Sequence, residues 1–84
     1  MVKLQVYVSD ECWSCAEARR VATEVAGQFH DVSLELLDVA KTERPADIFA
    51  VPTYLLNGRV IFLGNPTRQE LSQKIMAAQG LPDS

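Results

Sequence analysis

Residues 3–29 read KLQVYVSDECWSCAEARRVATEVAGQF, in which a strand pattern is followed by a helix pattern. Apolar and polar residues alternate from Lys3 to Val8, the period of a strand that is buried on one face. The apolar residues then recur every three or four positions, which predicts a helix with one buried stripe: Cys15, Ala18, Ala22, Val25 and Phe29. Gly27 should weaken this helix near its end. The stretch therefore predicts a strand that runs into a helix, with Cys12-Trp13-Ser14-Cys15 at the junction.

A second strand follows this helix. Apolar and polar residues alternate again over Val32–Leu36. One helix separates the two strands, and such a crossover is normally parallel and right-handed. The next segment, Ala40–Ala50, is charged and contains Pro45, which indicates a short or irregular helix.

The C-terminal part predicts a hairpin and a capped helix. Thr53–Leu56 and Arg59–Leu63 flank Asn57-Gly58, a dipeptide in which both residues tolerate positive φ, as a tight hairpin turn requires. Thr67 and Glu70 have the spacing of a capping box at the start of a helix. The buried stripe and the end of this last helix are marked by Leu71, Ile75, Ala78, Gly80 and Pro82.

These elements predict one α/β domain over residues 1–84, in the order β-α-β-(α)-β-β-α. A parallel pair followed by an antiparallel hairpin makes a mixed four-stranded sheet, which helices should flank. Hydrophobic residues make up 48% of the 84 residues, enough for one core that needs neither a metal nor a structural disulfide.

Composition also limits the partners and the compartment. The net charge is −3 and no basic stripe is present, which argues against nucleic acid. No apolar run approaches the length of a membrane span, and the N-terminus lacks the apolar segment of an export signal. We therefore expect a cytoplasmic protein without membrane contacts. In that reducing compartment paired cysteines are more often catalytic or metal-binding than structural.

The chain has two cysteines, and their surroundings distinguish them. Cys12 is expected at the N-terminus of the helix, where free N–H groups and the helix dipole stabilise a thiolate, although Asp10 and Glu11 oppose its ionisation. Cys12 Sγ can accept a hydrogen bond from the N–H of Cys15, three positions further on. Cys15 begins the buried stripe and should be shielded from solvent. Cys12 is therefore the expected nucleophile, and Cys15 the thiol that resolves the mixed disulfide.

Two motifs, Cys12-Trp13-Ser14-Cys15 and Val51-Pro52-Thr53 ahead of the hairpin, together resemble the thioredoxin/glutaredoxin superfamily. The chain length resembles its small glutaredoxin-like members. The resemblance implies a monomeric thiol-disulfide oxidoreductase with a redox-active disulfide, acting in electron transport without a cofactor. It implies a cis-proline at Pro52 that faces the dithiol, and a Val51 backbone that pairs with an extended substrate. Trp13, beside the nucleophile, is either an apolar contact for the substrate or a packing residue.

The implied partners are disulfide-containing proteins and an electron donor, either a thioredoxin-reductase-like protein or glutathione. Glutaredoxins hold glutathione with a Gly-Gly and an acidic residue where this chain has Gly64-Asn65-Pro66-Thr67, which favours a protein donor. Two other functions stay open. One Cys-x-x-Cys and one histidine are too few to close a zinc site in a monomer, but a dimer could share an iron–sulfur cluster. A thioredoxin-fold binding module could also use the surface around Trp13 and Pro52 without turnover.

Overall fold

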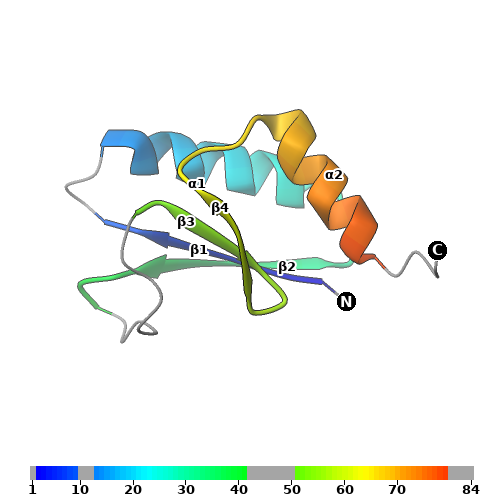
Figure 1. Cartoon of the computed structure of the whole chain (residues 1–84), viewed down its shortest axis with the longest axis horizontal. Coiled ribbons are helices and arrows are strands. Elements are labelled where there is room, and N and C mark those ends of the chain that lie inside the picture. The colour runs from blue at the N-terminus through cyan, green and yellow to red at the C-terminus, as the bar shows by residue number, and fades with distance from the viewer. Residues whose placement is uncertain (1, 10–12, 42–50, 80–84) are drawn as a thin grey trace.

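The computed structural model describes residues 2–9, 13–41 and 51–79, in which helices and strands follow the apolar pattern of the sequence (Figure 1). In chain order these elements are β1 (Val2–Val8), α1 (Trp13–Ala26), β2 (Val32–Asp38), β3 (Thr53–Leu56), β4 (Arg59–Leu63) and α2 (Arg68–Ala78).

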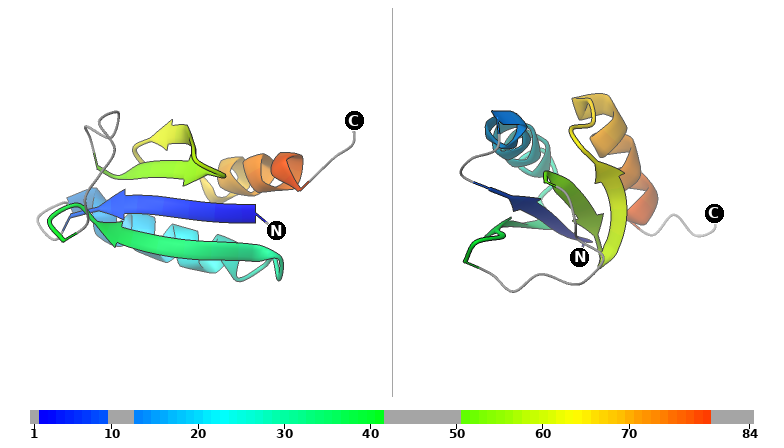
Figure 2. Two further views of the ribbon diagram at one scale, coloured as in Figure 1. Left: turned by 90° about the horizontal axis from the view of Figure 1, so that it is seen from below. Right: turned by 60° about the vertical axis from the view of Figure 1, so that its left-hand side comes forward.

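The strands form one four-stranded sheet in the order β2-β1-β3-β4. β1 and β2 are parallel and joined through α1, whereas β3 is antiparallel to both β1 and β4. Both helices lie on the same face of this sheet, as the different views show (Figure 1, Figure 2). The predicted α/β fold with a mixed four-stranded sheet is thereby confirmed.

The main core lies between the sheet and the two helices. In β1, Leu4, Val6 and Val8 are buried in this core, because alternate residues of a strand share one face. The helices contribute the residues of their predicted stripes: Cys15, Ala18, Ala22, Val25, Leu71 and Ile75. Burial of these side chains is the main force that holds the helices on the sheet.

The hairpin and the cap of α2 form as predicted. Asn57 and Gly58 both have positive φ, 51° and 87°. Asn57 also accepts a hydrogen bond from the N–H of Lys3 through Oδ1, at 2.9 Å, and so ties the turn to β1. At the start of α2, Thr67 and Glu70 make both hydrogen bonds of a capping box. The hairpin turn and the helix cap therefore both form from residues whose local chemistry favours them.

The predicted extent of α1 is wrong at its C-terminal end. The helix ends at Ala26, and Phe29 lies beyond it in the connecting turn. Gly27 favours the end of a helix over its interior, and the N–H of Phe29 bonds the carbonyl of Ala26 at 3.1 Å. Phe29 still packs against the core, so it shares the apolar spacing of the stripe without sharing the helix.

Two other expectations fall partly or wholly beyond the described ranges. Of the irregular helix expected over Ala40–Ala50, the structure describes Ala40 and Lys41, which lie in a turn; residues 42–50 are outside. Gly80 and Pro82, the expected end of α2, are outside as well. Within residues 2–9, 13–41 and 51–79, no helix has the length and apolar character that a membrane span needs.

Candidate redox site

The candidate site lies where β1 passes into α1. Ser9 directly follows β1 and Trp13 is the first residue of α1, so the motif occupies the strand-to-helix junction that the sequence predicts. Cys12 lies outside the described residues, and its role as nucleophile stays a prediction. So does the substrate contact expected of Trp13.

Cys15 lies in the first turn of α1 on its core-facing side. Its side chain is 0% exposed, as predicted, and is part of the core cluster. The N–H of Ser9 donates a hydrogen bond to Cys15 Sγ, with 3.4 Å between nitrogen and sulfur. The sulfur is disulfide-bonded in the structure, whereas its cycling with Cys12 stays a prediction. A buried sulfur that accepts a backbone hydrogen bond is better suited to react with another cysteine of the same chain than with a substrate that arrives from solvent.

Val51 and Pro52 immediately precede β3. The peptide bond between them is cis, the geometry that the resemblance implies. Pro52 is buried and Val51 is half-buried against the core cluster that includes Cys15. The carbonyl of Pro52 accepts a hydrogen bond from the N–H of Gly64 at 2.8 Å. This hydrogen bond ties the Val51–Pro52 segment to the residue that follows β4. The pairing of this segment with a substrate stays a prediction.

Two side chains that are not among the predicted site residues, Tyr54 and Asn65, contact α1. Asn65, in the connection from β4 to α2, donates through Nδ2 to the carbonyl of Ser14 at 2.9 Å. The hydroxyl of Tyr54 lies 3.2 Å from Asn65 Oδ1 and 3.4 Å from the carbonyl of Ala18. The segment Gly64-Asn65-Pro66-Thr67 differs from the Gly-Gly and acidic residue of glutaredoxins, and this difference is the one signal in the sequence that points to Asn65. Nothing in the sequence pattern pairs Asn65 with Ser14, because 51 positions separate them.

The hydroxyl of Tyr54 acts as a hydrogen-bond donor inside the core. Burial raises the pKa of Tyr54 to about 12, and the carboxylate of Glu17 contributes to this rise because it opposes a second negative charge. The phenol therefore stays protonated across the physiological range and keeps its hydrogen to donate. Its ring packs edge-on against Phe62, with ring centroids 6.3 Å apart.

Tyr54→Phe is expected to flatten the decline of stability at alkaline pH. In the folded protein the pKa of Tyr54 is about 12, against 10.0 for an ordinary tyrosine. The neutral phenol therefore stabilises the fold fully below the lower value, and this contribution is lost as pH rises through the higher one. Near neutral pH the lost hydrogen bond should cost about 1 kcal/mol. Urea unfolding of both proteins across this pH range checks the prediction, and parallel declines would contradict it.

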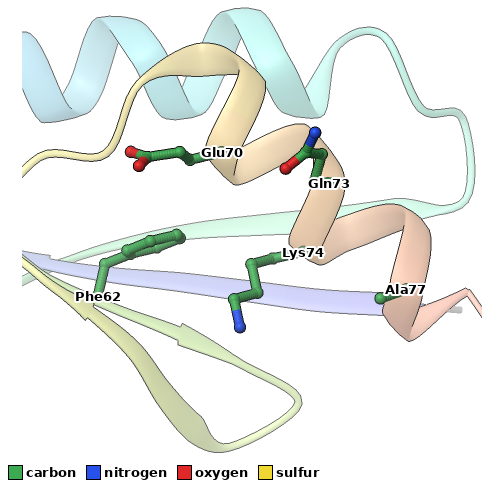
Figure 3. Close-up of a pocket in the computed structure, with 5 residues that line it drawn as sticks. All are labelled: Phe62, Glu70, Gln73, Lys74 and Ala77. Carbon is green, nitrogen blue, oxygen red and sulfur yellow. The ribbon is translucent and has the colours of Figure 1, made fainter.

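A separate groove lies between β4 and α2, with a volume of about 380 Å³ (Figure 3). Its lining residues are Phe62, Glu70, Gln73, Lys74 and Ala77. None of them belongs to the predicted site, and the carboxylate of Glu70 is already engaged by the N–H of Thr67 at 2.9 Å. The groove therefore adds no residue to the predicted site at the junction of β1 and α1.

The described residues do not extend the motif into a metal site. Across residues 2–9, 13–41 and 51–79, no three or more His, Cys, Asp or Glu side chains are grouped so that they could hold a metal ion. His30, the single histidine of the sequence, lies exposed in the turn that follows α1. The metal-binding alternative gains no support from this part of the chain.

Solved structures with a similar fold confirm a thioredoxin-like architecture. One comes from work entitled "Structural basis of the thiol resolving mechanism in yeast mitochondrial 1-Cys peroxiredoxin via glutathione/thioredoxin systems". It matches with a TM-score of 0.76 and 18% identity, over 90% of this chain and 77% of the other. A thioredoxin-like protein from Bacillus cereus matches with a TM-score of 0.66 and 21% identity, over 93% and 88%. At these identities the likeness establishes the fold.

Sequence relatives carry the assignment further, although no protein-family profile matches the chain. A thioredoxin from Methanocaldococcus jannaschii is 38% identical over 78 residues, which cover 88% of this chain and 92% of the relative. Probable thioredoxins from Methanothermobacter marburgensis and Methanothermobacter thermautotrophicus are 35% and 33% identical over 79 residues, 89% of this chain and 93% of each relative. On this similarity along nearly its whole length, the chain belongs to the thioredoxin family of thiol-disulfide oxidoreductases.

Proposed function

We propose that the chain reduces disulfide bonds of other proteins, with Cys12 as the attacking thiol and Cys15 as the resolving thiol. The observation that carries this proposal is the position of Cys15, fully buried in the first turn of α1 with the Ser9 N–H on its sulfur. A thiol in this place is reached most easily from the neighbouring end of its own helix. The relatives named thioredoxin support the same chemistry.

The reaction proceeds in two exchanges. The Cys12 thiolate attacks one sulfur of the substrate disulfide, that bond breaks, and one substrate thiolate leaves and takes up a proton. Cys15 then gives up its proton and attacks Cys12 Sγ, which breaks the mixed disulfide and releases the second substrate thiol. The substrate is reduced and the Cys12/Cys15 pair is oxidised. A dithiol donor restores the reduced pair by the reverse exchanges.

Substrate and donor are expected to meet the protein near the motif. We assign the backbone of Val51 and the ring of Pro52 to positioning the extended substrate, and Trp13 to an apolar contact with it. For the donor, the described residues favour a thioredoxin-reductase-like protein over glutathione. Asn65 is engaged with Ser14, and the guanidinium of Arg68 forms an ion pair with Glu24 at 2.6 Å, so neither side chain is free to hold a glutathione carboxylate. A monomer in the cytoplasm fits this proposal.

A trapping experiment tests the order of the two thiols. The Cys15→Ser protein should remain covalently bound to a disulfide-containing protein such as insulin, because the resolving attack is missing. Non-reducing electrophoresis and mass spectrometry should locate the link at Cys12, and dithiothreitol should release it.

The control is the Cys12→Ser protein, which should trap nothing under the same conditions. Absence of a trapped species with Cys15→Ser, together with no reduction of insulin by the wild type, would reject the oxidoreductase proposal in favour of a binding module. A link found at Cys15 in the Cys12→Ser protein would reverse the assignment of the two thiols.

A further inference from the structure

The connection from β4 to α2 contacts both halves of the candidate site. Gly64 lies in the left-handed region, with φ of 94°, and its N–H bonds the carbonyl of Pro52 at 2.8 Å. The next residue, Asn65, bonds the carbonyl of Ser14 at 2.9 Å. Two adjacent residues therefore link the proline segment to the first turn of α1.

The amide of Asn65 is held at both ends, which sets its orientation. A backbone carbonyl can only accept a hydrogen bond, so the group that faces Ser14 must be Nδ2. Oδ1 then points to the hydroxyl of Tyr54, whose single hydrogen is shared between Oδ1 at 3.2 Å and the carbonyl of Ala18 at 3.4 Å. Because Tyr54 is itself fully buried, this support for Asn65 comes from the core and not from solvent.

The carbonyl that Asn65 bonds belongs to the peptide group between Ser14 and Cys15. The N–H at the other end of this group is that of Cys15, which is the predicted hydrogen-bond donor to the sulfur of Cys12. A hydrogen bond to a carbonyl polarises its peptide group and strengthens the N–H as a donor. With the predicted contact of Cys12, the Asn65 amide and the Cys12 sulfur would act on opposite ends of one peptide group.

We propose that Asn65 is a positioning residue for the redox reaction, which holds the Ser14–Cys15 peptide group and thereby sets the reduction potential of the cysteine pair. This inference rests on the proposed function of Cys12 and Cys15. A stronger Cys15 N–H donor stabilises the thiolate that exists only in the reduced state. A more stable reduced state makes the pair a stronger oxidant. Loss of the Asn65 amide should therefore make the pair more reducing.

Redox equilibration against a reference dithiol, such as dithiothreitol, measures this effect directly. The bond from Asn65 to Ser14 exists in both redox states, so only the strengthening of the Cys15 N–H as a donor to the thiolate affects the potential. One hydrogen bond strengthens the next by roughly 10–30%, and a bond to a charged group is the stronger kind. Asn65→Ala is therefore expected to shift the equilibrium constant towards the disulfide by roughly 1.3- to fivefold, which lowers the potential by ~3–20 mV. Asn65→Asp should shift it at least as far, because an oxygen replaces the donor and adds a negative charge. Tyr54→Phe should produce a smaller shift in the same direction.

Asn57→Ala is the matched control, since Asn57 is also a turn asparagine whose side chain bonds backbone, but at the opposite end of the hairpin. It should lower the melting temperature and leave the potential unchanged. A potential of Asn65→Ala equal to that of the wild type would overturn the inference and reduce Asn65 to a structural link. Equilibration with dithiothreitol needs no protein substrate. Failure of the wild type to reduce insulin would therefore reject the proposed function without affecting this result.

Discussion

Replacing Cys12 by serine is expected to lower the rate of protein disulfide reduction to that of the electron donor alone. A serine hydroxyl is not ionised near neutral pH, so the mixed disulfide that begins the reaction cannot form. Reduction of insulin with dithiothreitol as the final donor, followed by the precipitation of the freed chains, measures the rate. This is the largest effect that we expect of any single change, because it removes the first chemical step.

Two controls accompany the Cys12→Ser experiment: the variant must be folded, and Cys15 must be shown not to attack the substrate by itself. Circular dichroism should show the same helix and strand content for the Cys12→Ser and reduced wild-type proteins. Cys12→Ala should be as inactive as Cys12→Ser. Turnover above the donor background in both variants would mean that the buried Cys15 can act as a nucleophile on its own, and would contradict the proposed order of attack.

Leu71→Ala is expected to destabilise the fold by about 2–5 kcal/mol. Leu71 is 0% exposed on the core-facing side of α2, and alanine would leave a cavity between this helix and the sheet. At the size of this domain the melting temperature should fall by roughly 10 °C or more. Thermal and urea unfolding of the fully reduced proteins measure the change, so that no disulfide contributes to the difference.

Met76→Ala supplies the comparison within the same helix. Met76 is 47% exposed, so its truncation removes little buried surface, and alanine is a good helix former. We expect a change within about 0.5 kcal/mol of the wild type. Equal losses for Leu71→Ala and Met76→Ala would show that α2 does not pack on the sheet in the way described.

Local sequence patterns predicted most of the fold because the forces behind them act over a few residues. The alternation in β1, the two positive φ values at Asn57-Gly58 and the capping box at Thr67 all follow from residues that are neighbours in the chain. The extent of α1 was overestimated for the same reason. Apolar spacing continues to Phe29, but spacing alone does not distinguish a helical residue from one that reaches the core from a turn.

The candidate site also combines features that follow from short segments of the chain with features that depend on the tertiary structure. Two cysteines at a strand-to-helix junction, a stripe that buries Cys15 and a proline ahead of β3 are properties of short segments, so the sequence by itself determined the kind of chemistry and the fold that supports it. The bonds from Ser9 to Cys15, from Gly64 to Pro52 and from Asn65 to Ser14 were decided only by the tertiary structure. At least one partner in each of these three hydrogen bonds is a backbone group, and every residue has backbone groups of this kind. No residue pattern encodes such a pairing until the sheet brings β4 beside β3 and places the Gly64–Asn65 connection next to the first turn of α1.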